Sequence, residues 1–321
     1  MKNLISLILL IGIVAISGCV GGPDIFRGIF GPSQPAVEQT PDLLIFSSAG
    51  IVPNPPISAD NDFTVWVELK NQAEPGTPDV KNVKFKIYDY GVCKSNSKLE
   101  ESYSTFSAGQ IERIENEFKA PSNNEIGFIE ADCPIRYYVS YITSARSQDD
   151  FDIISTDRLK ELQRLGESPS WKDQPQYVGI GPVKIYFNWK TLGPVEESKT
   201  IQFSIQVVDK GNGVFDKVEK GTLFLEVPVE WLGNIQNLEG DKTTFCNDKF
   251  LYTGYDSNTK IATLKINQVI KLINKQTPEI VCTFKAPEIE EPEKSYIIKA
   301  YIDNYEYKLY GEQIVHIKPS A

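Results

Sequence analysis

The chain has 321 residues, with 33 Lys and Arg against 43 Asp and Glu, which gives a formal charge of −10. Hydrophobic residues make up 41% and charged residues 24%, as in folded globular proteins rather than disordered or polytopic membrane chains. The length suggests about two domains. The acidic balance excludes non-specific nucleic-acid binding, which needs an excess of Lys and Arg. A single histidine excludes sites built from several imidazoles.

The N-terminus has the pattern of an export signal. Lys2 precedes an almost continuous apolar run over residues 4–16, and small residues then lead to Cys19. This order is typical of a secretory signal with a cleavage site after small residues. The apolar run is shorter than the roughly 20 residues that a spanning helix needs.

The segment Ser17-Gly18-Cys19 resembles the lipobox of lipoproteins, and its continuation Cys-Val-Gly-Gly is similar to archaeal surface lipoproteins. The resemblance implies that residues 1–18 are a cleaved signal peptide and that Cys19 carries a lipid. The protein would then lie at the extracytoplasmic face of the cell membrane, anchored by that lipid. An uncleaved N-terminal anchor helix and plain secretion are the alternatives.

Residues 19–41 are rich in Gly and Pro, which do not build regular elements. We expect the lipidated Cys19 to be followed here by a flexible tether. From Asp42 onward the pattern changes to one of period two.

Alternating apolar and polar residues predict half-buried antiparallel strands in both halves of the chain. The clearest are residues 63–70, 83–88 and 136–143 in the first half and 183–189, 201–207 and 296–302 in the second. Many short strands separated by turn residues predict an all-β fold of two β-sandwiches in tandem. We place the first domain at residues 42–154 and the second at 181–321.

A short internal repeat supports a duplicated design. Phe118-Lys-Ala-Pro recurs as Phe284-Lys-Ala-Pro, and each copy is followed by a polar loop and a strand pattern. Proline at a strand exit is expected because it cannot continue a central strand.

Residues 155–180 are interpreted as a helical joint between the domains. Residues 157–166 predict one short helix, with Thr156 or Asp157 as N-cap and Gly166 as its end. The three leucines in this helix share a face, which predicts packing on a sheet.

Five short segments spread over residues 42–319 share one character. They are Asp42-Leu43-Leu44-Ile45, Pro53-Asn54-Pro55-Pro56, Val67-Glu68-Leu69-Lys70-Asn71, Gly181-Pro182-Val183-Lys184-Ile185 and Val208-Asp209-Lys210-Gly211-Asn212-Gly213. These segments resemble cell-adhesion-related immunoglobulin-like domains of archaeal and bacterial surface proteins. The resemblance implies two immunoglobulin-like β-sandwiches in tandem, and a role in display, adhesion or scaffolding rather than catalysis.

Four cysteines remain beside Cys19, two in each expected domain. Outside the cytoplasm such residues form disulfides, and although three connectivities are possible for four cysteines we expect one bond per domain. The pairs are Cys93 with Cys133 and Cys246 with Cys282. A thiolate metal site or a nucleophilic cysteine is disfavoured because there is no Cys-x-x-Cys pair.

The other candidate sites are favoured as ordinary structure. His316 is expected on an exposed strand face, and no Gly-x-Ser-x-Gly motif is present to form a triad with it. The acidic stretch 287–293 is expected to be a solvated loop. Oxygen-bearing residues at 60–62 and 209–216 suit Ca²⁺, but we favour turns there. No metal site, no other cofactor and no enzymatic activity are therefore expected.

Tyrosines gather near the C-terminus. Strand alternation places Tyr301, Tyr305 and Tyr307 on one outward face, which suits a recognition surface. Cross-strand packing on an exposed sheet face is the alternative.

Together these patterns predict a lipid-anchored, non-enzymatic surface protein for adhesion, envelope scaffolding or display of a binding face. Its partners would be the membrane, through Cys19, and a surface protein or glycan, with no nucleic acid. The alternative is an extracytoplasmic binding or accessory subunit of a membrane complex, which an exposed Tyr-rich patch would favour; an extracellular hydrolase is less favoured.

Overall fold

The computed structural model describes residues 42–73, 77, 80–169, 176–233, 238 and 243–320. The signal peptide and tether expected over residues 1–41 lie outside these residues. The described chain is mostly β-strand with the short helix α2 (Thr156–Leu165), so the all-β prediction is confirmed. Within the described part, no helix is long and apolar enough to cross a membrane.

The first half forms alternating strands because its apolar residues recur at every second position. In β3 the four residues Phe63, Val65, Val67 and Leu69 are all at most 3% exposed. The strands are β1 (Leu44–Val52), β2 (Ile57–Ser58), β3 (Asp62–Asn71), β4 (Val80–Asp89), β5 (Lys94–Ser95), β6 (Glu100–Phe106), β7 (Ile111–Lys119) and β8 (Ala131–Ile154).

The second half repeats this arrangement and adds the short 3-10 helix η2 (Val229–Leu232). Its strands are β9 (Tyr177–Val178), β10 (Val183–Trp189), β11 (Val195–Glu196), β12 (Thr200–Asp209), β13 (Lys217–Val218), β14 (Leu223–Pro228), β15 (Thr244–Phe245), β16 (Phe250–Asp256), β17 (Ile261–Ile266), β18 (Ile270–Lys271), β19 (Ile280–Lys285) and β20 (Glu293–Lys318).

One large sheet runs through both halves, in the order β15-β16-β17-β14-β20-β8-β4-β6. The sheet β1-β3-β7-β5 packs on the first-half strands of this large sheet, and β10-β12-β19 packs on the second-half strands. The result is sandwich-like layers in each half, as the sequence predicts.

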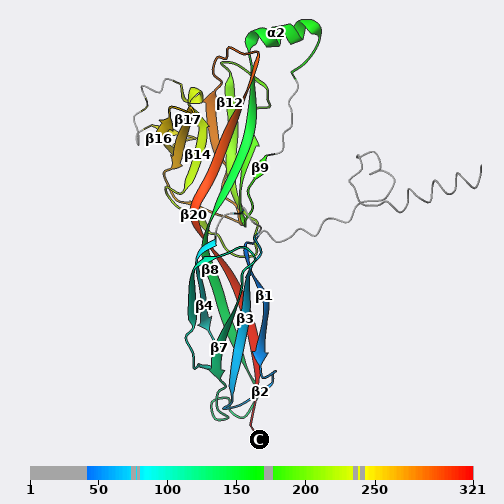
Figure 1. Cartoon of the computed structure of the whole chain (residues 1–321), viewed down its shortest axis with the longest axis vertical. Helices are drawn as coiled ribbons and strands as arrows, with labels where there is room; N and C mark the ends of the chain where they lie inside the picture. Colours follow the sequence, from blue (N-terminus) through cyan, green and yellow to red (C-terminus); the bar gives the residue numbers. More distant parts are fainter. Residues whose placement is uncertain are drawn as a thin grey trace, which may run out of the picture. The chain divides into compact units, whose positions relative to one another are not determined.

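The long strands β8 and β20 are common to both sandwiches (Figure 1). They pair antiparallel from Ala131 opposite Ile317 at one end to Ile154 opposite Glu293 at the other. We call the part of the fold around β4 and the 131–143 stretch of β8 the first lobe, and the part around β14 and the remainder of β8 the second lobe. Each half of the chain therefore gives its last strand to both lobes.

The hydrophobic clusters follow the lobes and not the order of the chain. Val315 and Ile317, from the end of the chain, pack with Phe63 and Phe85 in the first lobe. The larger cluster contains second-lobe residues together with Leu43, Leu44 and Tyr141. The larger cluster thus extends across the junction into the first lobe, and Phe46 and Tyr103 pack against both clusters.

The expected boundary between residues 154 and 181 does not divide the core. Residues 40–321 form one compact unit, in which the second part of β8 belongs to the second lobe and the end of β20 to the first. Alternation within a strand identifies its buried face but does not identify its partner, which here is about 160 residues away in the sequence.

Helix α2 leaves from the end of β8 that pairs with Glu293, and therefore does not lie between the lobes (Figure 1). Its N-cap is Ser155, whose hydroxyl accepts from the Arg158 N–H, and not Thr156 or Asp157 as expected. Gly166 ends the helix with φ of 72°, as predicted. Leu162 is buried but Leu165 is 63% exposed, so the expected leucine face is only partly packed.

The repeated Phe-Lys-Ala-Pro segments occupy the same place in both halves. Phe118 is the next-to-last residue of β7 and lies opposite Phe63, and Phe284 is the next-to-last residue of β19 and lies opposite Ile201. The strands that follow are β8 and β20, which pair with each other. In each half, a strand that ends near Phe-Lys-Ala-Pro is therefore followed by one of the two long strands.

Candidate functional site at the junction of the lobes

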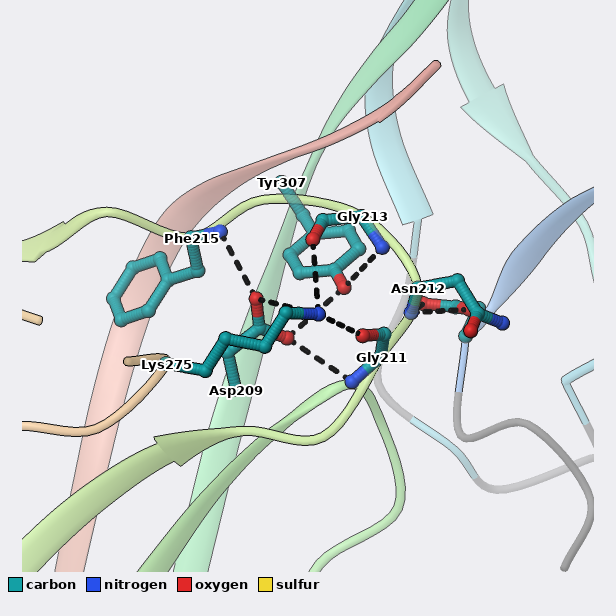
Figure 2. Close-up of polar contacts among 8 residues, drawn as sticks. Asp209, Gly211, Asn212, Gly213, Phe215, Lys275 and Tyr307 are labelled. Atoms are coloured by element: carbon teal, nitrogen blue, oxygen red, sulfur yellow. Dashed lines mark hydrogen bonds and ion pairs between the residues drawn. The ribbon is translucent and has the colours of Figure 1, made fainter. Parts of the chain in front are cut away.

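The loop after β12 forms a polar cluster where the lobes meet (Figure 2). The Asp209 carboxylate is buried and accepts hydrogen bonds from the Gly211 N–H (3.0 Å), the Phe215 N–H (3.3 Å) and the Tyr307 hydroxyl (3.0 Å). The Tyr307 hydroxyl in turn accepts from the Gly213 N–H at 2.9 Å. We call these residues, with Lys275, Asn212 and Asp42, the junction cluster.

Lys275 closes the same loop from the other side (Figure 2). Its Nζ donates to the carbonyl of Gly211 (2.6 Å) and to that of Gly213 (3.4 Å), and lies 3.9 Å from Oδ2 of Asp209. The backbone N–H of Asp209 donates to the carbonyl of Lys275 at 2.8 Å. The loop is therefore fixed by both backbone and side-chain contacts.

Asp42, at the beginning of the described chain, joins the first strand to this loop. Its carboxylate accepts from the backbone N–H and from Nδ2 of Asn212, each at 3.0 Å to Oδ2. Asp42 is buried, so these bonds are shielded from competing water.

Burial sets the protonation of the cluster. Burial raises the pKa of Asp209, while the hydrogen bonds from Tyr307 and Gly211 and the charge of Lys275 act in the opposite direction. The pKa of Tyr307 is raised well above its usual range by burial, and the nearby charges of Asp209 and Asp42 raise it further. The hydroxyl therefore remains protonated and donates to Asp209.

The cluster is built as a structural contact. The oxygens of Asp209 are occupied by internal donors, and the segment 209–216 is a turn, as favoured from its composition. Asp60 and Asn61 also lie in a turn, in which Asn61 N–H donates to the Ser58 carbonyl, and Asp62 begins β3. In the described part of the chain, no group of three His, Cys, Asp or Glu residues is placed to hold a metal ion.

The predicted disulfides are confirmed. Cys93 bonds to Cys133 in the first-lobe core and Cys246 to Cys282 in the second. All four sulfurs are used, so Cys19 is the one cysteine of the sequence outside these bonds.

The expected outward tyrosine face is wrong for two of its three members. Tyr305 and Tyr307 are 4% and 0% exposed, whereas Tyr301 is half-buried. The reason is a β-bulge between Ile302 and Tyr305, which places two residues of β20 opposite Ser144. One additional residue moves every later side chain to the other face of the sheet.

A group of tyrosines, two of them exposed, lies further along the same sheet, in the first lobe. Tyr88 and Tyr310 are 48% and 53% exposed, and with Tyr138 they form three mutual ring contacts at 5.9–6.3 Å between centroids. Beside them Arg136 bridges Asp89 (2.8 Å) and Glu312 (2.9 Å). We call Tyr88, Tyr138 and Tyr310 the tyrosine surface.

The remaining candidates have the ordinary roles expected of them. His316 is exposed, and its Nδ1 lies 2.6 Å from Oδ1 of Asp132 on the neighbouring strand. Residues 287–292 form the loop between β19 and β20.

No known protein family and no curated protein sequence matches this chain. Among solved structures it is similar to red sea bream transglutaminase (10% identity, 87% of this chain, 31% of that chain, TM-score 0.19). It is also similar to the secreted serine protease VesC from Vibrio cholerae (7%, 83%, 49%, 0.18) and to the CupB6 tip adhesin from Pseudomonas aeruginosa (8%, 86%, 97%, 0.15). The chain spans less than half of the first two proteins, and at these TM-scores the similarities support no conclusion on function.

Proposed function

We propose that this chain is a lipid-anchored, non-enzymatic protein of the extracytoplasmic membrane face, which serves adhesion, envelope scaffolding or display of a binding face. The observation that carries the proposal is the pairing of four of the five cysteines in disulfides, which leaves Cys19 outside these bonds. Four cysteines are paired in two disulfides, a state typical of compartments outside the cytoplasm. Cys19, in its lipobox-like segment, is left as the site of lipid attachment.

The fold supports a display role. The lobes share β8 and β20 and are joined by the junction cluster, so they form a continuous support for an exposed face. The tyrosine surface offers amphipathic rings of the kind that protein interfaces use. This surface also favours the second candidate function, an accessory subunit of a membrane complex that contacts its partner through Tyr88 and Tyr310.

Cell fractionation of an expressing host that processes lipoproteins tests the anchor. We expect the wild-type chain in the membrane fraction, with a mass that corresponds to cleavage after Gly18 and addition of lipid. The Cys19→Ser variant should be released to the medium, while Ser33→Ala, a control in the same segment, should stay with the membrane. A Cys19→Ser chain that remains in the membrane, or a wild-type chain in the cytosol with free thiols, would overturn the proposal.

A further inference from the structure

The outer face of the second lobe carries a groove on the large sheet. A hollow of about 530 Å³ is lined by Arg146, Gln148, Tyr177, Glu226, Lys299 and Tyr301, among others. A second hollow of about 450 Å³ adjoins it, shares Arg146 and Tyr177, and extends to Lys81 and Ile142 of the first lobe. We call the two together the sheet-face groove.

The sheet register places these side chains on one face. Tyr301 of β20 lies opposite Arg146 of β8 on one side and Phe224 of β14 on the other. In the next row on this face, Lys299 lies between Gln148 and Glu226. Because opposite residues in antiparallel strands share a face, these rows form a surface across three strands, while Ser147, Ala300 and Leu225 point inward and are buried.

An aromatic ring forms part of the floor. Tyr301 stacks on Phe224 with 5.0 Å between ring centroids and 16° between planes. Its hydroxyl bonds to the Glu226 carboxylate, and its pKa is raised by burial and then by the charges of Glu226 and Asp303. The ring is thus held in place, and Tyr177, 63% exposed, stands at the side of the groove.

The charges in the larger hollow balance, and the smaller hollow adds Lys81. Arg146 and Lys299 provide two cations, and Glu226 and Asp303 provide two carboxylates. Among the described residues, none of these four takes part in an ion pair. Glu226 is engaged by the Tyr301 hydroxyl, and the side chains of Arg146, Lys299 and Asp303 are available to a ligand. The equal opposite charges of the larger hollow, which contains Tyr301, favour neither an anion nor a cation.

The backbone N–H and C=O groups of the strands beneath the groove are already paired with neighbouring strands. Here β8 pairs with β20 and β9, β20 with β8 and β14, and β14 with β20 and β17. A peptide therefore cannot add as a further strand at this place. Recognition must come from side chains, which suits a ligand with many hydroxyl groups and apolar C–H faces.

We propose that the sheet-face groove binds an uncharged oligosaccharide. A sugar ring packs its C–H face on an aromatic ring such as Tyr301, and its hydroxyls match both charged donors and carboxylate acceptors. Two hollows in succession suit a chain of sugars better than a single amino acid. The inference deepens the proposed function by naming a glycan as partner, and it rests on that function because surface glycans lie outside the cytoplasm.

Calorimetric titration of the detergent-solubilised full-length chain tests this proposal. The neutral probes are maltose, cellobiose, lactose and chitobiose, and the charged probes are glucuronate, inorganic phosphate and glycine betaine. We expect saturable binding of at least one neutral disaccharide, with a Kd of about 1 mM or below. Tyr301→Ala should weaken that binding about tenfold, Tyr301→Phe should retain most of it, and the exposed Tyr255→Ala of the same lobe should leave it unchanged.

The proposal is overturned if no neutral disaccharide binds, if only charged probes bind, or if Tyr301→Ala binds as tightly as wild type. Circular dichroism of each variant shows that the fold is kept, and Tyr301→Phe gives a folded reference if the alanine variant does not fold. Titration does not depend on the anchor, whereas fractionation of Cys19→Ser does not depend on the groove. The failure of one proposal is therefore distinguishable from the failure of the other.

Discussion

The hydroxyl of Tyr307 donates a hydrogen bond of 3.0 Å to Asp209, although the two residues are 98 positions apart in the chain. Tyr307 belongs to β20, and Asp209 ends β12 in the opposing layer of the second lobe. The same hydroxyl accepts from the Gly213 N–H. One side chain thus joins the two layers at the point where the lobes meet.

The variant Tyr307→Phe should therefore destabilise the fold. It removes a donor from buried Asp209 and leaves the Gly213 N–H without its acceptor, which should lower the free energy of unfolding by roughly 2 kcal/mol. Urea denaturation at neutral pH measures this difference. The control Tyr310→Phe, on the exposed tyrosine surface, should change stability by less than about 0.5 kcal/mol. Equal effects of the two variants would contradict a role for the buried hydroxyl.

The effect of Tyr307→Phe should also depend on pH. Burial raises the folded-state pKa of Asp209 above its ordinary 3.8, so protonated Asp209 favours the folded state in acid and this contribution is lost as the pH rises through the raised pKa. Loss of the Tyr307 donor should raise the pKa further, because this hydrogen bond stabilises the carboxylate. The deficit of the variant should therefore be larger at pH 7 than below the raised pKa, and a constant deficit would contradict this explanation.

Gly211 is a second sensitive position in the junction cluster. A Cβ added there would meet the Tyr307 hydroxyl, the Asp42 carboxylate and Pro182. Gly211→Ala should force these groups apart and lower the unfolding free energy by about 1–3 kcal/mol, measured by thermal or urea denaturation. The comparison variant Gly109→Ala meets no atom within 4 Å and has only the cost of its left-handed backbone (φ 76°). A Gly211→Ala protein as stable as wild type would show that the loop is not tightly packed.

Much of the fold was predictable because it depends on local pattern. The alternation over residues 63–70 identifies the buried side of β3, and a pair of cysteines in each half indicates one disulfide per half. The full length of β8 was not predictable, because its polar stretch 144–150 is held by pairing with a distant strand. Alternation predicts only the part near residues 136–143.

The site was less predictable than the fold. The tyrosine positions depend on the bulge at Asp303 and Asn304, which reverses the faces of β20. The available signal is this polar pair within an apolar alternation, since Asn tolerates the left-handed backbone found at Asn304 (φ 53°). The junction cluster has a weaker signal, the turn composition after Asp209. Its contacts with Tyr307 and Asp42 arise only from the tertiary fold.

Glu125 provides a test of surface electrostatics in the first lobe. The hydrogen bond from Lys94 (2.6 Å), followed by those from the Ser122 N–H and hydroxyl, lowers the pKa of Glu125 from 4.5 to about 2. Lys94→Ala should raise this pKa toward 4.5, measured by NMR titration of the Glu125 carboxyl, whereas Lys98→Ala should not. Because the folded-state pKa is lowered, the stabilising contribution is present above pH 4.5 and is lost as the pH falls toward 2. A midpoint that Lys94→Ala leaves unchanged would contradict the assignment.

The shared strands predict that the two halves of the chain do not fold separately. A fragment of residues 42–154 lacks the end of β20, including buried Val315 and Ile317, and leaves the long β8 without its partner. A fragment of residues 181–321 lacks Phe151 and Ile153 of the second-lobe core. Exposed edges and missing core residues should leave each fragment aggregated or without a cooperative unfolding transition.

The two fragments expressed together should restore a stable complex, because both long strands and their main partners are then present and only the two-residue strand β9 is missing. Co-purification through a tag on one fragment and a cooperative melting curve measure the restoration. A control pair that divides the chain at residue 167, after α2, keeps β8 and β20 whole in separate fragments and should also associate. A cooperative unfolding transition of residues 42–154 alone would show that the first lobe stands without β20, and the two lobes would then be independent domains in spite of their shared sheet.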